Sequence, residues 1–514
     1  MRLTVIGLAL FLLAACNSEA SSVDTCLSNV AIKNSTSYKI TVEDANAVRQ
    51  IQPAFFGFNL EWLVFQLSLW DTQQGAVRPD ALEVLRAFPG AVYRYPGGTM
   101  SNEFEWHEAI GEAKSRVIKQ QATWLKPLSV QFGLTEYLKF VREVGGEAWY
   151  VSNLYGKLRE ELPAETVAKS AGELAAFMRQ QKEAGLPSVL RWELGNELDR
   201  GGVHWSPQKL VMLSRVVSKE ISSQDASARF VAMLEEYPAM EQAGFSASAY
   251  NKILAEGLKP VVDEYAIHLY YDGKPDGPPV RQQLGALCRA VDDARAVGIN
   301  NPTVWITEHA RVPKGAFTTP DWKSVWTETA NLQAAISVSD MMIAAVQMPE
   351  VKGTMLHALH ATGGPWPLLH NTRSGDHLYS SVVLLAMRML RESMLPEVLR
   401  TRIESANISG YDGGYDMRAV VMTDPERKHY TVWAVNRDSH PVDTKLSIPA
   451  LNGAVLTGKY VSLSDENSKV NNYQNGLQVQ PVEKPIVLVF DASGNASVAL
   501  PPYSVSAISV ELHN

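Results

Sequence analysis

Two glutamates in the sequence follow predicted β-strands that lie far apart along the chain. Glu197 ends the segment Trp192-Glu-Leu-Gly-Asn-Glu197, and Glu308 follows the segment Thr303-Val-Trp-Ile-Thr307. Two carboxyl groups about 5–5.5 Å apart can hydrolyse a glycosidic bond with retention of configuration, because one protonates the leaving oxygen and the other attacks the anomeric carbon. We therefore predict that Glu197 is a general acid/base and that Glu308 is a nucleophile.

Alternating strand and helix patterns between about Pro53 and Arg391 predict the elements that position these glutamates. Predicted strands include residues 91–94, 148–152, 190–194, 230–233, 265–269 and 303–307, and helical patterns cover 135–144, 163–184, 207–222, 282–296 and 379–391. Repeated βα units over this length predict a (β/α)8 TIM barrel. Reactive residues of such barrels lie at the carboxyl ends of the strands, where glutamates after the fourth and seventh strands can converge.

The sequence pattern changes after residue 391. Short alternating strands such as 430–435, 485–490 and 505–510 are then separated by turn signals, and the early strand 37–42 has the same character. This pattern predicts a C-terminal β-sandwich domain. We assign residues 50–391 to the catalytic barrel, and residues 37–49 together with 392–514 to the sandwich, within an α/β fold class.

Polar residues beside the glutamates could assist them. The amide of Asn196 could hydrogen-bond the 2-hydroxyl of a sugar, a contact that strengthens in the transition state. Arg94, at the end of the second strand, would lower the pKa of Glu308 by its charge; its alternative role is a structural ion pair. Glu197 must begin protonated, so we expect it in a drier or more negative environment.

Further side chains at the predicted strand ends have two possible roles each. Tyr270 could donate to the nucleophile and His268 could contact the substrate, or both could fill the top layer of the barrel. Trp366 could stack on a sugar or anchor its loop. His357 and His360 have no accompanying carboxylate, and on a strand they would face opposite sides, so we expect one of them to line the pocket mouth. We predict neither a metal nor a cofactor.

Short motifs occur in islands from about residue 50 to residue 510: Phe56-Gly-Phe-Asn-Leu-Glu61, Arg94-Tyr-Pro-Gly-Gly98, Val151-Ser-Asn153, Leu194-Gly-Asn-Glu-Leu-Asp199, His268-Leu-Tyr270, Ile306-Thr-Glu308 and Leu500-Pro-Pro-Tyr-Ser-Val505. They resemble motifs of clan A glycoside hydrolases, and most of all the family-51 α-L-arabinofuranosidases. The resemblance implies that Glu61 binds the sugar, that Asn153 lies in the site, and that the sandwich packs on the barrel as a structural domain.

One departure from the family pattern leaves the sugar open. The residues Thr307-Glu308-His309-Ala310 stand where the family usually has Asp-Glu-Trp-Asn. We expect an α-L-arabinofuranosidase acting on poly- or oligosaccharides. A β-xyloside, β-galactoside or β-glucuronide remains an alternative substrate, and a uronate would need an additional cation. A catalytically inactive, glycan-binding surface lipoprotein is the alternative from another class; the presence of both glutamates favours an enzyme.

The N-terminus predicts export. The apolar run Leu3–Ala15 is shorter than the roughly 20 residues that span a bilayer, and has the length of a signal-peptide core. It ends at Cys16 in a segment that resembles the bacterial lipobox, which implies that residues 1–15 are removed and Cys16 carries lipid; ordinary cleavage near Ala20 is the alternative. Asn17 indicates outer-membrane sorting. Residues 16–36 would form a flexible tether, and we expect a bacterial cell-envelope lipoprotein.

The cysteine content and the net charge limit which bonds and binding partners are expected. Cys26 and Cys288 could pair, but one lies in the tether and the other deep in the main domain, so we favour two free thiols. The formal net charge of −8, without a basic stretch, argues against a nucleic-acid partner. We expect a carbohydrate substrate and a membrane reached through the lipid anchor, and the oligomeric state stays open.

Overall fold

The structure is a computed structural model that describes residues 30–31, 38–120, 126–157, 160–200, 203–235, 245–273, 277–313, 322–361, 364–372, 374–404, 407–408, 412–473 and 477–513. The expected signal peptide, Cys16 and most of the expected tether lie outside these residues. Within them, no helix combines the length and the apolar character that crossing a bilayer requires.

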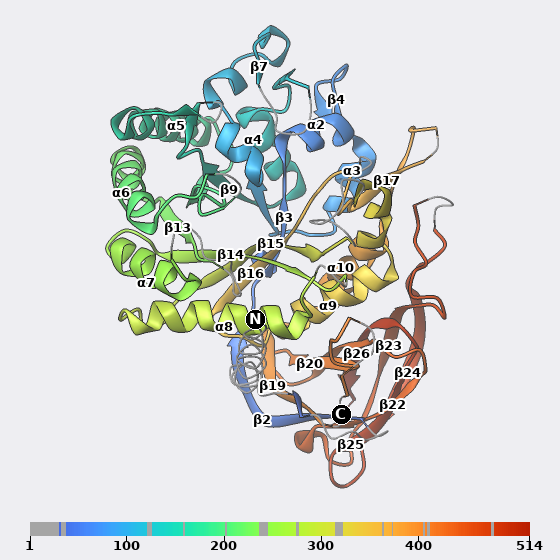
Figure 1. Ribbon diagram of the computed structural model, residues 1–514. Helices are drawn as coiled ribbons and strands as arrows, with labels where there is room; N and C mark the ends of the chain where they lie inside the picture. Colours follow the sequence, from blue (N-terminus) through green and yellow to red (C-terminus); the bar gives the residue numbers. More distant parts are fainter. Residues whose placement is uncertain are drawn as a thin grey trace, which may run out of the picture.

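Eight parallel strands close into a barrel (Figure 1). In chain order they are β3 (Phe56–Asn59), β6 (Val92–Tyr95), β9 (Glu147–Ser152), β12 (Val189–Leu194), β13 (Arg229–Met233), β14 (Glu264–Tyr271), β15 (Val304–Arg311) and β16 (Val351–Leu356). Each strand pairs with its neighbour in this order, and β16 pairs with β3 to complete the ring. The predicted (β/α)8 barrel is confirmed, with Glu308 on the seventh strand and Glu197 after the fourth.

Helices surround the barrel. They are α2 (Trp62–Leu69), α3 (Pro79–Leu85), α4 (Leu134–Val144), α5 (Ala164–Glu183), α6 (Pro207–Gln224), α7 (Ala247–Leu258), α8 (Val280–Ala296), α9 (Leu332–Ala345) and α10 (Val382–Ser393). Side-chain caps fix several starts: Ser206 accepts a hydrogen bond from the backbone N–H of Lys209 at the start of α6.

One helix starts later than its sequence pattern predicts. The expected helix 379–391 begins only at Val382, because the side chain of Ser381 accepts a hydrogen bond from Leu384 N and caps α10 there. The preceding residues form strand β18 (Leu378–Ser380), which pairs with β17 (Leu369–Asn371).

Short elements complete the barrel domain. They are the 3-10 helices η1 (Pro53–Phe55), η2 (Thr99–Glu103), η3 (Trp106–Ala109), η4 (Ala113–Ser115) and η5 (Trp322–Thr329), and the strand pairs β4 (Trp70–Asp71) with β5 (Ala76–Val77), β7 (Lys119–Gln120) with β8 (Leu128–Ser129), and β10 (Gly156–Lys157) with β11 (Glu160–Glu161).

Large apolar side chains fill the barrel interior. Trp149, Trp305 and Met355 are fully buried in one cluster there, and the two indole rings meet edge-on with their centroids 5.2 Å apart. The interior is therefore a packed core rather than a channel.

The C-terminal domain is built on one large curled sheet. Its path runs β24 (Val482–Val489), β23 (Val455–Ser464), β26 (Ser504–Leu512), β21 (His429–Asn436), β20 (Met417–Thr423), β19 (Glu397–Glu404), β2 (Tyr38–Gln50), β22 (Val442–Ser447) and β25 (Asn495–Leu500), with β1 (Val30–Ala31) beside β19 and the 3-10 helix η6 (Pro449–Leu451) after β22. The sheet encloses its own apolar core, which confirms the predicted β-sandwich.

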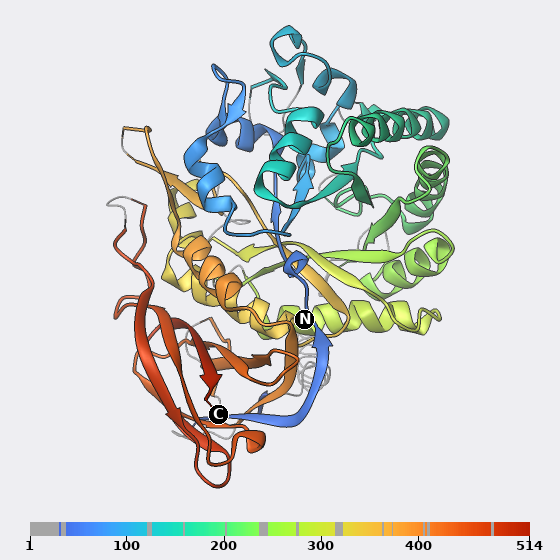
Figure 2. The same cartoon turned by 180° about the vertical axis from the view of Figure 1, so that it is seen from behind.

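Helix α9 joins the two domains. Every residue of α9 is buried, because the helix packs against β15 and β16 of the barrel and against β20, β21 and β26 of the sandwich. Figure 2 shows this layer of helices between the barrel and the sandwich. Because the two domains share this helix, the sandwich packs on the barrel and is not an independent domain.

Cys288 on α8 is disulfide-bonded. Its partner lies outside the described residues. The expectation of a free thiol at this position is therefore wrong, and the reason is that sequence separation says little about distance in the folded chain.

Candidate active site

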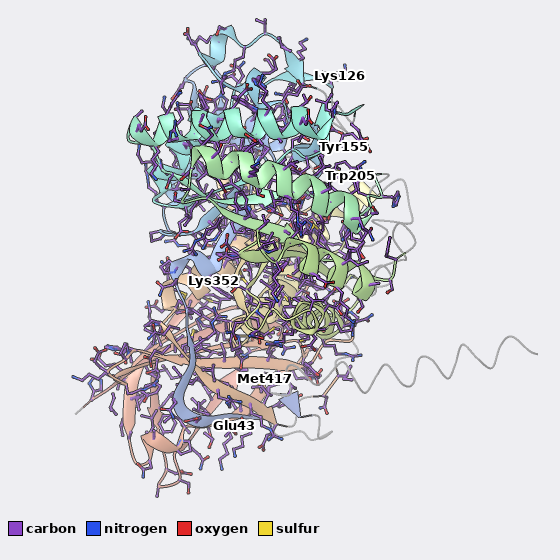
Figure 3. All side chains as sticks on the ribbon, turned by 90° about the vertical axis from the view of Figure 1, so that its left-hand side faces the viewer. Glu43, Lys126, Tyr155, Trp205, Lys352 and Met417 are labelled. Atoms are coloured by element: carbon purple, nitrogen blue, oxygen red, sulfur yellow. The ribbon has the colours of Figure 1, made fainter. Side chains whose placement is uncertain are left out.

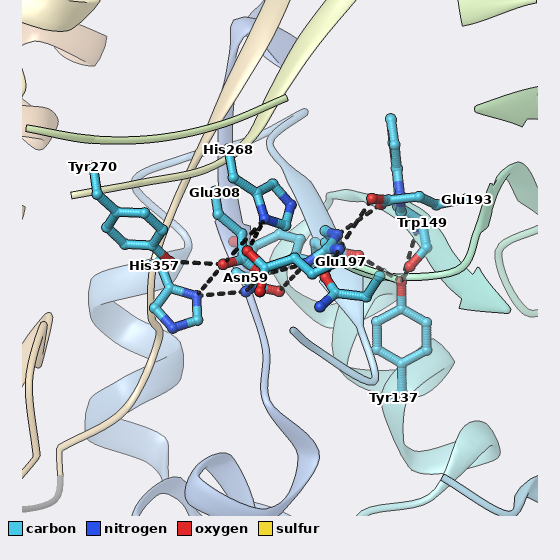
Figure 4. Close-up of polar contacts among 12 residues, drawn as sticks. Asn59, Tyr137, Trp149, Glu193, Glu197, His268, Tyr270, Glu308 and His357 are labelled. Carbon is cyan, nitrogen blue, oxygen red and sulfur yellow. Dashed lines mark hydrogen bonds and ion pairs between the residues drawn. The ribbon is translucent and has the colours of Figure 1, made fainter. Parts of the chain in front are cut away.

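Glu197 and Glu308 converge at the mouth of the barrel. Glu308 lies on β15, where the strand pairing with β14 shifts register next to His268. Glu197 lies beyond the end of β12 in a left-handed conformation with φ of 46°, after Gly195 with φ of 85°. This tight turn directs the Glu197 side chain back over the barrel, as Figure 4 shows. One ligand atom from each of Glu197, His268 and Glu308 lies within 4.8 Å of the other two.

The carboxylate of Glu308 is held by donors from three other strands. Its Oε1 accepts hydrogen bonds from Arg94 Nη1 at 2.8 Å and from Asn59 Nδ2 at 3.1 Å. Its Oε2 accepts one from the Tyr270 hydroxyl at 2.6 Å. Burial opposes ionisation, but the charges of His268 and Arg94 and the Tyr270 hydrogen bond outweigh it and hold the pKa of Glu308 well below its ordinary value. These contacts therefore favour the ionised form of Glu308, which is the form that a nucleophile needs.

Glu197 lies within hydrogen-bond distance of His268. Nδ1 of His268 lies 2.8 Å from Oε1 of Glu197. Burial raises the pKa of Glu197, yet the contact with His268 and the charge of Arg200 lower it below its ordinary value. Burial lowers the pKa of His268, but the charges of Glu308 and Glu197 have the larger effect, so this pKa lies above its ordinary value. The expected dry and negative surroundings of Glu197 are present, since burial and the charge of Glu308 both raise its pKa, but the imidazole and Arg200 outweigh them and stabilise the carboxylate.

Arg94 links the two halves of the site. Its guanidinium donates to Glu308, to Asn196 Oδ1 at 2.7 Å, and through Nε at 2.7 Å and Nη2 at 3.0 Å to the two oxygens of Glu193. Glu193 also accepts a hydrogen bond from Trp149 Nε1 at 2.8 Å. Arg94 is fully buried among these partners, so its orientation is fixed from both sides.

Asn196 offers a free donor towards the site. Its Oδ1 is occupied by Arg94, and its backbone carbonyl accepts a hydrogen bond from Asn102. Among the described residues, no partner is found for its buried Nδ2. That amide hydrogen can therefore meet a sugar hydroxyl without breaking an existing bond.

Two of the expected sugar-binding residues lie at the rim of the carboxylate cluster. Glu61 follows β3 and lies close to Nε2 of His357, at 3.9 Å; burial raises its pKa. The ring of Trp366 packs 5.2 Å from Tyr270 and 5.1 Å from His357, and its Nε1 donates to the carbonyl of Arg311. Trp366 thus anchors its loop and borders the site at once.

Asn153 does not join the carboxylate cluster. Its Nδ2 donates to the carbonyls of Gly156 and Phe104, and its Oδ1 accepts from the backbone N–H groups of Tyr155 and Gly156. These four bonds shape the loop after β9.

Sequence reasoning missed two residues of this cluster, since the motifs contain Asn59 and Glu193 but give neither of them a role. The expectation that His357 or His360 lines the pocket mouth is met by His357, although this residue does not lie on a strand. His357 instead follows β16, and its Nδ1 accepts a hydrogen bond from Asn59 Nδ2 at 2.6 Å while lying 3.5 Å from Glu308. His360 turns to the carbonyl of Pro365. A glutamate in the otherwise apolar end of β12 was the one signal that could have revealed Glu193.

Several known proteins are similar to this chain in sequence. The model of the alpha-L-arabinofuranosidase 1 domain matches residues 84–184. An intracellular exo-alpha-(1->5)-L-arabinofuranosidase of Streptomyces lividans is 22% identical over 91% of this chain and 75% of its own length. The chain resembles the family-51 arabinofuranosidases.

Solved structures agree with this resemblance at the level of the fold. A family 51 alpha-L-arabinofuranosidase from Bifidobacterium longum aligns with a TM-score of 0.76 at 17% identity, over 93% of this chain and 99% of its own. The arabinose complex of the Thermotoga maritima alpha-L-arabinofuranosidase gives a TM-score of 0.72 at 17% identity, over 93% and 100%. The predicted likeness to a clan A glycoside hydrolase of the family-51 type is confirmed.

Proposed function

We propose that this protein is a retaining α-L-arabinofuranosidase that uses Glu197 as general acid/base and Glu308 as nucleophile. The observation that carries the proposal is the short separation of the two carboxyl groups, within 4.8 Å at their nearest grouped atoms. Retaining enzymes place the two groups about 5–5.5 Å apart, whereas inverting enzymes need about 6.5–9.5 Å to admit a water. The arabinofuranosidase relatives favour the sugar.

The site geometry supports a two-step reaction. The ionised Glu308 attacks the anomeric carbon while Glu197 delivers the proton of the Glu197–His268 pair to the leaving oxygen. Glu197 then removes a proton from a water that attacks the glycosyl-enzyme, and Glu308 departs. Arg94, Asn59 and Tyr270 hold Glu308 in line throughout, and Asn196 Nδ2 would donate to the 2-hydroxyl.

The charges around the site favour a neutral sugar. Three carboxyl groups, of Glu61, Glu197 and Glu308, face the same cluster. The guanidinium of Arg94 is already engaged by Glu193, Glu308 and Asn196. A uronate carboxylate would therefore be repelled, so a β-glucuronide is the least favoured of the alternative substrates.

Replacement of the two glutamates tests the mechanism. Glu308→Ala should abolish hydrolysis of an aryl α-L-arabinofuranoside, and azide should partly restore turnover with a product of inverted configuration. Glu197→Ala should retain activity only on substrates with good leaving groups. Wild-type activity in Glu308→Ala, with an unchanged circular dichroism spectrum, would contradict the assignment.

A panel of substrates separates the sugars. The wild-type enzyme is assayed on the aryl α-L-arabinofuranoside, β-xyloside, β-galactoside and β-glucuronide. We expect cleavage of the arabinofuranoside first. Preferential cleavage of another glycoside would contradict the proposed sugar specificity but not the mechanism. Cleavage of none would favour a glycan-binding protein.

We further propose that the protein is an exported lipoprotein of the bacterial cell envelope, anchored through Cys16. The lipobox-like segment before Cys16 supports this location. The disulfide at Cys288 supports it as well, since disulfides persist in oxidising compartments and are rare in the cytosol.

A further inference from the structure

A cluster of six buried charges lies where the barrel meets the sandwich. Asp272 after β14, Arg311 on β15 and Asp340 on α9 come from the barrel, and Asp412, Arg418 and Arg437 come from the sandwich. All six are less than 8% exposed. Three carboxylates face three guanidinium groups, so the loss of one member would leave an uncompensated charge in the interior.

Arg437 is the sandwich arginine that contacts two carboxylates of the barrel domain. Its Nη2 donates to Asp340 Oδ2 at 2.7 Å, and its Nη1 donates to Asp272 Oδ2 at 3.0 Å. Arg418, on β20, bonds only to Asp340 among these carboxylates. Arg437 therefore bridges a helix and a strand end, whereas Arg418 contacts the helix alone.

Asp272 fixes the end of the strand that carries Tyr270. It is fully buried two residues after Tyr270, with φ of 56°. Its carboxylate accepts hydrogen bonds from Arg437 Nη1, from Ser337 Oγ at 2.6 Å and from Val280 N at 3.2 Å. A residue in this left-handed conformation stays there only where the surroundings hold it.

A second connection reaches the other side of the site. Arg311 Nη1 donates to Asp412 of the sandwich at 2.6 Å and lies 3.9 Å from Asp272. The backbone carbonyl of Arg311 accepts the hydrogen bond from Trp366 Nε1, and the Trp366 ring packs on Tyr270. Tyr270 is thus supported from its own strand end and from the neighbouring ring.

We propose that Arg437 of the sandwich is a positioning residue that acts through Asp272 to hold the Tyr270 hydroxyl on the nucleophile Glu308. The inference rests on the proposed glycosidase function. It gives the sandwich a part in catalysis: the domain supplies the charge that keeps the end of β14 in place. A misplacement of about 1 Å at a reacting group can cost about a hundredfold in rate.

Arg437→Met tests the proposal, with Arg418→Met as the matched control. Both variants remove a buried sandwich arginine from Asp340, so both should lower the melting temperature. Arg437→Met should also lower kcat by on the order of tenfold to a hundredfold, while Arg418→Met should stay within about twofold of wild type, as expected for a change without contact to the strand end. Equal kcat losses in the two variants would overturn the proposal.

A double-mutant cycle with Tyr270→Phe identifies the route. If Arg437 acts through Tyr270, Arg437→Met should cost little further activity once the hydroxyl is gone, whereas additive losses would contradict that route. If Arg437→Met fails to fold, Arg437→Lys takes its place. Lysine keeps the charge but lacks the planar guanidinium that hydrogen-bonds Asp272 and Asp340 together, and the kcat of this variant is compared with that of Arg418→Met in the same way.

A crystal structure of the variant gives a reading that needs no substrate. The Tyr270 hydroxyl should leave hydrogen-bond distance of Glu308 Oε2, and a retained 2.6 Å contact would overturn the inference. If the wild-type enzyme cleaves no glycoside, the proposed function fails by itself. If it cleaves one and Arg437→Met matches Arg418→Met, only the positioning role fails.

Discussion

At the scale of single residues, the site depends on Arg94. Its orientation is set by Glu193, a carboxylate that takes no part in the proposed reaction. Glu193 binds Arg94 through two hydrogen bonds and receives a third from Trp149. The lower barrel repeats this chemistry, because Glu264 accepts hydrogen bonds from Arg191 Nε at 2.7 Å and Trp305 Nε1 at 2.8 Å. The chain thus offers a natural control for the role of Glu193.

We expect Glu193→Gln to lower kcat/KM by on the order of tenfold to a hundredfold, because a neutral amide leaves Arg94 under-compensated and free to turn away from Glu308. Glu264→Gln makes the same change at the lower arginine and should lower the melting temperature while leaving kcat/KM within about twofold. Steady-state kinetics and thermal melts of both variants check this. Parallel loss of activity in both would assign Glu193 to stability alone.

The contact between Glu197 and His268 predicts the alkaline limit of activity. The pKa of His268 is raised by Glu308 and Glu197 against the opposing effect of burial. The pair therefore keeps its proton below that raised pKa and loses it as the pH rises through it, so kcat/KM should fall on the alkaline side. In His268→Gln only the Glu197 carboxyl can hold the proton, and the alkaline limb should move to lower pH.

A second buried histidine serves as the control for this pH profile. Burial lowers the pKa of His370 to about 4, so it is neutral throughout the working range. His370→Gln should therefore leave the alkaline limb in place. An unmoved limb in His268→Gln would show that the proton is held elsewhere.

At the scale of elements, the loop after β6 brings backbone against the nucleophile. A Cβ atom on Gly98 would lie 2.7 Å from Glu308 Oε1 and 3.4 Å from Glu61 Oε1. Contacts under 3.0 Å force a shift, and here the neighbour is a carboxylate fixed by Arg94 and Asn59. The two glycines of Gly97-Gly98 are thus required by the close approach of this loop.

Gly98→Ala should therefore lower kcat by about a hundredfold, through displacement of Glu308. Gly172→Ala on α5 adds the same methyl group in a helix outside the barrel, where the nearest atom is Glu220 Cβ at 3.3 Å. That control should keep wild-type kcat. Full activity of Gly98→Ala would mean that the loop yields instead of the nucleophile.

The elements were largely predictable from the sequence, and the contacts between them were not. Strand burial and helix capping depend on residues that are neighbours in the sequence. The apolar runs of β12 and β15 and the N-cap of α6 could therefore be recognised from the sequence. The roles of Glu193 and His357 depend on partners at positions 94 and 59. Only the closure of the barrel brings such residues together, and no local sequence pattern predicts which residues will then be in contact.

At the scale of the whole molecule, buried ion pairs as well as apolar packing connect the two domains. Helix α9 is shared by both, and Asp340 on it receives Arg418 and Arg437 from the sandwich. Buried ion pairs contribute little net stability but penalise any arrangement that separates them. The sandwich is thus held in one orientation on the barrel. Figure 3 shows the sandwich below the barrel with all side chains drawn.

The disulfide at Cys288 bears on the proposed lipid anchor. The sequence holds three cysteines, and if Cys16 carries lipid, only Cys26 is left to pair with Cys288. Cys26 lies ten positions after Cys16, a span of at most about 35 Å in extended chain. If the proposed lipid anchor and this pairing are both correct, ten positions separate the lipid-bearing cysteine from the disulfide.

Peptide mapping without reduction should therefore recover Cys26 joined to Cys288, and the N-terminal peptide of the membrane fraction should carry lipid on Cys16. Cys16→Ser should move the enzyme from the membrane fraction to the soluble fraction with unchanged kcat, because the role proposed for Cys16 is anchoring and not catalysis. Cys288→Ser should leave the protein anchored and lower its melting temperature, since a disulfide typically contributes about 2–4 kcal/mol. Recovery of Cys16 in the disulfide would exclude the lipid anchor, because one sulfur cannot hold both.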